Sequence, residues 1–126
     1  MARRRQKKLF LHYSLPVLVY VAAIFAVSSL PDLQPPFSFA NADKLAHLME
    51  YALLGLLLAR AVRATLRIEW PLVAGLLMLL LGMTVGLSDE LFQSLIPGRQ
   101  SSAMDFLADT LGLALAQLVY LAVVRD

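Results

Sequence analysis

Four long apolar stretches alternate with short polar connections along the chain. They cover about residues 9–30, 44–61, 70–88 and 103–124. A helix needs about 20 mainly apolar residues to cross the hydrocarbon layer of a bilayer, which is about 30 Å thick. Pro31 and Pro97 follow the first and third stretches, where proline ends a helix because it lacks an amide hydrogen. The pattern predicts an all-α, polytopic membrane protein with four transmembrane helices in a single domain, residues 1–126.

The composition agrees with this interpretation and excludes several other classes of protein. Of the 126 residues, 60% are hydrophobic and 16% are charged, whereas soluble domains carry about 25% charged residues. The mean hydropathy is +0.71. A small soluble domain of this composition could not cover its core with polar residues. The absence of cysteine excludes a disulfide scaffold, and a total of 12 Gly and Pro residues excludes a collagen-like chain.

The basic residues predict the orientation of the helices. Arg and Lys residues that flank transmembrane helices stay on the cytoplasmic side. They gather before the first stretch and after the second: Arg3, Arg4, Arg5, Lys7, Lys8, Arg60, Arg63 and Arg67. Both termini are therefore expected to be cytoplasmic. With Glu69, Arg125 and Asp126 included, the inner segments carry +7 and the outer segments −5, which together give the net charge of +2.

This distribution accounts for the basic balance of the chain, and no nucleic acid partner is expected. A cleaved signal peptide is an alternative interpretation of the first stretch, because Ala26 and Ser28 could form a small-residue cleavage site. The apolar run is long for a signal peptide, however, and cleavage would leave three spans. Retention of the first span is therefore the favoured interpretation.

Polar residues recur at helical spacing near the outer ends of the last three stretches. Polar groups are costly inside a bilayer, so each one points to a function. One set shares a helical face through the spacings i, i+4, i+7 and i+8: Asp43, His47, Glu50 and Tyr51. A second set stands at the end of the third stretch: Asp89, Glu90 and Gln93. A third set opens the fourth stretch: Asp105, Asp109 and Gly112.

These three sets are expected to converge. At about 1.5 Å per residue, His47 and Glu50 lie about 6–10 Å below the outer end of the second helix, and Asp109 lies about 6 Å below Asp105. Helices joined by short connections are usually neighbours. The polar faces of the second, third and fourth helices should therefore meet in the outer third of the membrane, near the loop that carries Arg99.

The predicted cluster is strongly acidic. Six carboxylates face two cations: Asp43, Glu50, Asp89, Glu90, Asp105 and Asp109 against Lys44 and Arg99. They cannot all stay ionised near a low-dielectric layer without compensation. Protons, a bound cation or a cationic group of a ligand could supply it, and His47 could exchange a proton. Oxygen ligands suit a divalent cation such as Mg²⁺ or Ca²⁺, for which the candidates are Glu50, Asp89, Glu90 and Asp105.

Plainer interpretations exist for several of these residues. Asp43 could cap the second helix, and Ser101 or Ser102 could cap the fourth. Asp89 and Glu90 could be solvated at the membrane surface. Arg99 could pair with a nearby acid, or it could hold a phosphate with two hydrogen bonds. The polar residues within the spans could also form a purely structural network between helices.

Two motifs in this region resemble those of the VanZ-like membrane family. The first is Asp43-Lys44-x-x-His47-x-x-Glu50-Tyr51-x-x-Leu54-Gly55. The second is Asp89-Glu90-x-x-Gln93-x-x-x-Pro97-Gly98-Arg99-x-x-Ser102-x-x-Asp105-x-x-Ala108-Asp109-x-x-Gly112. Asp109 stands where many relatives have asparagine, which adds a carboxyl group. The resemblance implies a four-span protein of the bacterial cytoplasmic (inner) membrane, connected with the cell envelope, in a family associated with teicoplanin resistance.

Three functions remain open at this point. The first is a pocket in the outer leaflet, among membrane lipids, that binds a lipid headgroup, a lipid-linked cell-wall precursor or a glycopeptide antibiotic with a lipid tail. Its candidate residues are Asp43, His47, Glu50, Tyr51, Glu90, Gln93, Arg99, Ser102, Asp105 and Asp109. The second is an intramembrane hydrolase or transferase for a lipid-linked substrate, with His47, Glu50 and Asp105 as catalytic candidates. The third is a helix bundle that scaffolds partners.

Overall fold

The described chain folds into helices joined by loops, as the apolar pattern predicts. The computed structural model describes residues 1–123, among which there is no β-strand. The elements are α1 (Ala2–Leu9), a π-helical turn η1 (Phe10–Ser14), α2 (Leu15–Ser28), α3 (Ala42–Leu66), α4 (Pro71–Gln93) and α5 (Ala103–Val123). The predicted end of the fourth span at Val124, and the charges of Arg125 and Asp126, lie outside the described residues.

Four helical segments are long and apolar enough to cross a membrane. The first, 27 residues long, joins α1, η1 and α2, and α3, α4 and α5 follow with 25, 23 and 21 residues. Their outward faces carry large apolar side chains, such as Leu72, Leu80 and Leu118, which are 73%, 63% and 66% exposed. Such surfaces are stable in contact with lipid tails but not in contact with water. The protein is therefore a multi-pass membrane bundle.

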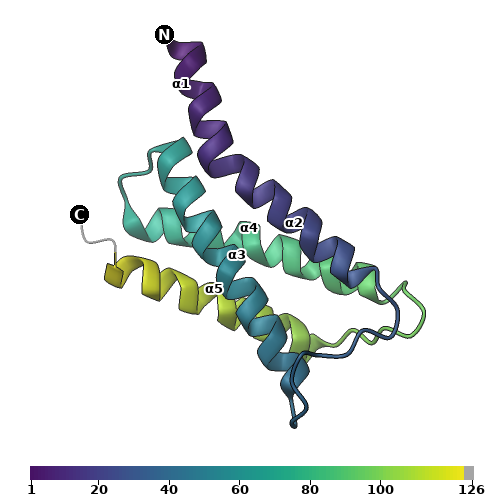
Figure 1. Ribbon diagram of the computed structural model, residues 1–126. Coiled ribbons are helices and arrows are strands. Elements are labelled where there is room, and N and C mark those ends of the chain that lie inside the picture. Colours follow the sequence, from purple (N-terminus) through teal and green to yellow (C-terminus); the bar gives the residue numbers. More distant parts are fainter. Residues whose placement is uncertain (124–126) are drawn as a thin grey trace.

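Three of the four helices extend beyond the predicted spans at one end or both, although the first ends before the predicted limit at residue 30. The first begins at Ala2 and ends at Ser28, the second continues to Leu66, and the third continues past Ser88 to Gln93. The predicted limits followed the charged residues, but backbone hydrogen bonding does not stop where apolar residues end. Figure 1 shows the basic helix α1 projecting past the rest of the bundle. The longer α4 brings Asp89 and Glu90 inside a helix.

Helix α3 lies at the centre of the bundle. It packs most extensively against α5, and it also contacts α4, α2 and η1. Its buried side chains, among them Tyr51, Leu54 and Leu58, form the core with Met78 of α4 and Leu113 of α5. Since lipid tails are as apolar as these side chains, close packing rather than hydrophobicity must hold the helices together.

Glycines make the α3–α5 contact close. A Cβ atom added at Gly112 of α5 would collide with the Leu48 carbonyl oxygen and would lie 2.9 Å from the Ala52 nitrogen, both in the α3 backbone. A Cβ atom at Gly55 of α3 would lie 2.6 Å from Ala116 Cβ. The two backbones therefore approach each other at positions where a larger residue does not fit.

The two ends of the bundle differ in charge. The α3–α4 connection lies near η1 at one end, together with Arg60 and Arg63 (Figure 1). The α2–α3 and α4–α5 loops meet at the other end, beside Asp43, Glu50 and Asp105. The structure thus separates a basic end from an acidic end, as the positive-inside pattern requires.

Replacement of Gly112 by alanine should destabilise the bundle. The new Cβ meets backbone atoms that cannot rotate away, and overpacking of this kind costs about 1–3 kcal/mol. Gly75→Ala is the matched control, because there the Cβ meets only the flexible end of the Gln117 side chain. Thermal unfolding in detergent should show a lower midpoint for Gly112→Ala and an unchanged or higher one for Gly75→Ala. Equal unfolding midpoints for the two variants would contradict the conclusion that the backbones of α3 and α5 are too close at Gly112 for a larger residue.

The orientation can be tested because the chain has no cysteine of its own. A cysteine at exposed Gln100 marks the acidic end, and one at exposed Glu69 marks the basic end. In intact cells, a membrane-impermeant thiol reagent should label the Gln100→Cys protein only. Labelling of Glu69→Cys instead would reverse the predicted topology.

Candidate functional site

Three helices each contribute a polar side chain to the centre of the acidic end. His47 of α3 places its Nδ1 atom 2.8 Å from Oδ1 of Asp109 on α5 and 3.7 Å from Oε1 of Glu90 on α4. The side chains of Asp109 and Glu90 are only 1% and 8% exposed. We call His47, Glu90 and Asp109 the central cluster. The polar faces of these helices therefore converge.

A second group connects the central cluster to the first span. The Tyr51 hydroxyl donates a hydrogen bond to Asp89 Oδ2 at 3.4 Å, and Gln93 Nε2 donates to the same oxygen at 3.0 Å. Gln93 Nε2 also lies 3.1 Å from Ser28 Oγ in α2. Tyr20 of α2 donates to the Glu50 carbonyl oxygen at 2.8 Å. Polar contacts thus hold α2 against α3 and α4.

Lys44 links the starts of α3 and α5. Its Nζ atom lies 2.6 Å from Asp43 Oδ2 and 2.5 Å from Asp105 Oδ1. Ser102 accepts a hydrogen bond from the Asp105 amide at 3.1 Å, which confirms it as the cap of α5, and its own amide donates to Glu90 Oε2 at 3.3 Å. The start of α5 is therefore fixed to both α3 and α4.

Three buried carboxylate oxygens have no hydrogen-bond partner within residues 1–123. They are Asp89 Oδ1, Glu90 Oε1 and Asp109 Oδ2. A buried acceptor left unpaired costs about 1–3 kcal/mol, and more when it is charged. Two of these oxygens belong to the central cluster, so the cluster holds more negative charge than its described partners neutralise. A proton or a bound cation would remove this cost.

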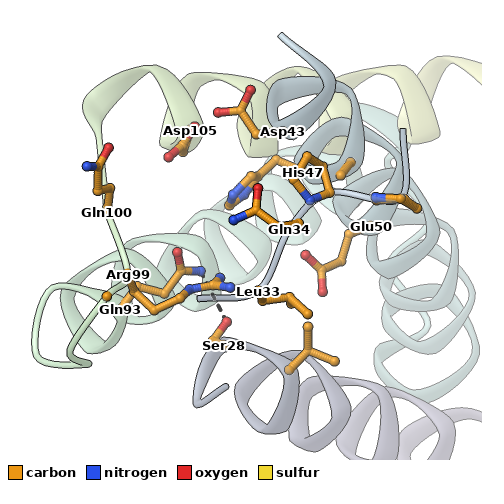
Figure 2. Close-up of a pocket in the computed structure, with 15 residues that line it drawn as sticks. Ser28, Leu33, Gln34, Asp43, His47, Glu50, Gln93, Arg99, Gln100 and Asp105 are labelled. Carbon is orange, nitrogen blue, oxygen red and sulfur yellow. Dashed lines mark hydrogen bonds between the residues drawn. The ribbon is translucent and has the colours of Figure 1, made fainter. Parts of the chain in front are cut away.

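A cavity of about 520 Å³ opens beside the central cluster. Figure 2 shows the Arg99 guanidinium and the Glu50 carboxylate projecting into it from opposite sides. His47, Asp43 and Asp105 also line it. Apolar side chains of the α2 end and the following loop complete the wall: Val27, Leu33, Pro35 and Pro36. The cavity therefore combines both signs of charge with an apolar side.

Two loops border this cavity. Gly98 in the α4–α5 loop has φ +79°, and a Cβ atom there would collide with the carboxylate of Asp32 in the α2–α3 loop. Glycine is thus required both by the backbone angle and by the approach of the second loop. This contact positions Arg99, the next residue, over the cavity.

Three of the plainer interpretations of the sequence are wrong. Asn41, not Asp43, occupies the cap position of α3, and Asp43 lies in the first turn, where it pairs with Lys44. Asp89 and Glu90 are 0% and 6% exposed, so they are buried rather than solvated. Arg99 forms no ion pair with an acid in the described part of the chain. Asp89 and Glu90 are buried because α4 continues past them to Gln93 and packs against α2, α3 and α5.

Sequence reasoning missed several residues of this site. Ser28 and Tyr20 contact it from α2, and the segment from Leu33 to Pro36 forms part of the cavity wall. Polar residues within an apolar span were a usable signal for both, since Tyr20 and Ser28 are two turns apart on one face. The loop segment carries no such signal, because its role depends on the tertiary fold.

The central cluster also has the composition of a metal site. One ligand atom from each of its three residues lies within 4.8 Å of the others. Ligand atoms on one Zn²⁺ ion are about 3–4.4 Å apart, given bonds of about 2.0–2.2 Å, so small side-chain shifts would suffice. An imidazole with two carboxylates suits Zn²⁺ or Mn²⁺ better than Mg²⁺ or Ca²⁺. Of the four predicted metal ligands, only Glu90 belongs to this group.

Comparison with known proteins identifies the family. A family model described as VanZ/LLP1 matches residues 2–124, nearly the whole chain. Neither the comparison with curated proteins nor that with solved structures gave a match. The match includes all four helical segments and both motifs that form the acidic end. The chain therefore belongs to the VanZ/LLP1 family, as its two motifs predict.

Proposed function

We propose that this protein resides in the bacterial cytoplasmic membrane and binds the polar headgroup of an amphiphile in the cavity at its acidic end. The observation that carries the proposal is the cavity itself, in which Arg99 and Glu50 face each other beside an apolar wall. A ligand that is polar at one end and apolar at the other fits such a lining. The exposed apolar helices give its lipid tail access from the membrane.

The charges favour a headgroup that carries both a phosphate and an amine. Arginine binds phosphate oxygens with two parallel hydrogen bonds, and Arg99 is without an acidic partner among residues 1–123. The Glu50 side chain makes no hydrogen bond or ion pair in the described chain, so its carboxylate is available to an ammonium group. Asp43 and Asp105 add negative charge on the same side, although Lys44 offsets part of it.

The predicted orientation places this cavity in the outer leaflet, facing the cell wall. Three kinds of amphiphile are candidates for this cavity: an aminophospholipid, a lipid-linked cell-wall precursor, and a glycopeptide antibiotic with an acyl chain such as teicoplanin. Of these, the aminophospholipid and the precursor carry the phosphate that Arg99 would recognise, and the antibiotic does not. All three combine a lipid tail with a polar head. A role in the cell envelope and in teicoplanin resistance would follow from binding one of them.

Binding of a short-chain phosphatidylethanolamine to the purified protein tests the headgroup proposal. The same lipid with an acetylated amine serves as the comparison ligand, because acetylation removes the positive charge. A hydrogen bond to a charged group contributes about 1.5–3 kcal/mol, so Glu50→Gln should weaken phosphatidylethanolamine binding roughly 10- to 100-fold. The acetylated lipid is an anion, so this comparison uses chains that also carry Arg63→Gln, which removes a basic residue of the opposite end. In that background the acetylated lipid should bind the chain with an intact Glu50 about as weakly as phosphatidylethanolamine binds the Glu50→Gln variant.

Two further variants sharpen this test. Arg99→Lys should weaken both lipids alike, because each retains the phosphate that the guanidinium fork recognises. Glu69→Gln is the matched control, since Glu69 is an exposed carboxylate at the opposite end of the bundle. If Glu50→Gln and Glu69→Gln bind phosphatidylethanolamine equally well, the cavity is not the headgroup site and the scaffold function is favoured.

A second candidate function is metal-assisted hydrolysis or transfer on a lipid-linked substrate. It is favoured by the central cluster, in which one imidazole and two carboxylates converge around unpaired oxygens. A divalent cation there would balance the two carboxylates and could acidify a bound water. Glu50, in the adjoining cavity, would then be placed to accept a proton.

Metal titration of the purified protein tests this second candidate. Zn²⁺ or Mn²⁺ should raise the midpoint of thermal unfolding, because a ligand bound only to the folded state stabilises it. Glu90→Gln removes one ligand and should abolish the increase, whereas Glu69→Gln should retain it. An unchanged midpoint of the wild-type protein in the presence of metal and of chelator would exclude a structural or catalytic metal at this cluster.

A further inference from the structure

A second cavity lies at the basic end of the bundle, away from the acidic site. Its volume is about 730 Å³. It is bounded by η1, the last turns of α3, the α3–α4 connection and the end of α5. Two arginines of α3, Arg60 and Arg63, lie three residues apart and both line it. Residues at this spacing share a face of a helix, so both guanidinium groups lie beside the same cavity.

Each arginine is held against an aromatic ring. Arg60 Cζ lies 5.5 Å from the ring centre of Tyr13 in η1, and Arg63 Cζ lies 4.8 Å from that of Tyr120 in α5. A cation over an aromatic face is attracted to it, and the stacked guanidinium keeps its N–H groups free along its edge. The two side chains are thus positioned in advance, with hydrogen-bond donors available.

The donors of Arg63 are incompletely used. Its Nη2 atom is buried and has no hydrogen-bond partner within residues 1–123. The ion pairs in that part of the chain involve only Lys44 and His47 as cations. Arginine stays charged in proteins, so it cannot avoid the cost of burial by losing its proton. A hydrogen-bond acceptor from outside the chain would therefore satisfy this donor, and the positive charge of the guanidinium group favours an anion.

The remainder of the lining indicates which anion fits. Apolar side chains, among them Leu56, Ile68 and Val119, form much of the wall, and Glu69 lies at its edge. One carboxylate against two guanidinium groups leaves the cavity with a net charge of +1. This charge matches a singly charged phosphodiester, and the apolar wall matches acyl chains. The basic residues of α1 also increase the local concentration of anionic lipid at this end.

We propose that Arg60 and Arg63 form a binding site for the phosphodiester of an anionic phospholipid at the basic end of the bundle. The site is independent of the headgroup cavity at the acidic end, because the two have no lining residue in common. Under the predicted orientation it faces the cytoplasmic leaflet, where such a lipid would fix the depth of α3 and α5 in the membrane.

Native mass spectrometry of the full chain, released from detergent, tests this site. Phosphatidylglycerol and phosphatidylcholine with identical acyl chains are titrated separately. The wild-type protein should retain one phosphatidylglycerol at concentrations at which phosphatidylcholine does not bind. Arg63→Gln should weaken phosphatidylglycerol binding at least tenfold, and Arg60→Gln should also weaken it. Arg67→Gln is the matched control: Arg67 is exposed at the same end but does not line the cavity, so its removal should change affinity less than twofold.

A second pair of variants guards against loss of folding. Tyr120→Phe retains the ring under Arg63 and should bind like the wild type, whereas Tyr120→Leu removes it and should weaken binding. Equal losses in Arg63→Gln and Arg67→Gln would overturn the proposal in favour of general surface attraction. Competition by millimolar inorganic phosphate would overturn the lipid assignment and indicate a site for free phosphate.

Discussion

The close approach of α3 and α5 at Gly112 is the constraint on which the acidic end depends. Gly112 lies one turn after Asp109, and the backbone that it meets belongs to Leu48, the neighbour of His47. Contact between the two backbones therefore sets the separation of His47 and Asp109, whose side chains meet at 2.8 Å. Glu90 reaches the same point because Gly86, one turn earlier in α4, faces Tyr51 and Asp109 without a side chain of its own. The glycines thus determine how closely the helices approach, and through this they determine where the polar side chains meet.

This dependence also explains why the buried carboxylates of the acidic end can keep oxygens without hydrogen-bond partners. In a membrane, helices associate through packing and hydrogen bonds, and the backbone contact supplies packing that does not rely on the polar side chains. Asp89, Glu90 and Asp109 can then keep unpaired oxygens, at a cost that a structural network would avoid by pairing them. A purely structural role would predict complete pairing, so the unpaired oxygens favour a cluster that receives a proton, a cation or a ligand.

The fold could be predicted from the sequence because it follows from periodicity: four apolar runs imply four helices. The meeting of the three polar faces could be predicted from their similar depth and from the short connections that make successive helices neighbours. The helix ends were less predictable, since α4 continues through Asp89 and Glu90 in spite of their charge. The cavity wall at Leu33 and the placement of Arg99 depend on loop contacts between distant residues, which no local pattern records. A site for zinc or manganese depends on three-dimensional distances between ligand atoms, which the sequence does not give. Glu50 and Asp105 were therefore predicted as metal ligands, whereas in the structure His47 and Asp109 form the group with Glu90.

Helix α3 carries both proposed sites and also separates them. Glu50 and Arg60 are ten residues apart, about 15 Å along the axis at about 1.5 Å per residue. Between them, Gly55 presses against Ala116, so the middle of α3 is fixed to α5. Coupling between two sites requires an element with two alternative arrangements that both ligands bias. A helix held at its centre by direct contact offers no such alternative, so an acidic-end ligand and a basic-end phosphodiester should bind without affecting each other's affinity. The two proposals therefore assign one helix to two headgroup sites of different chemistry, one at each end of the bundle.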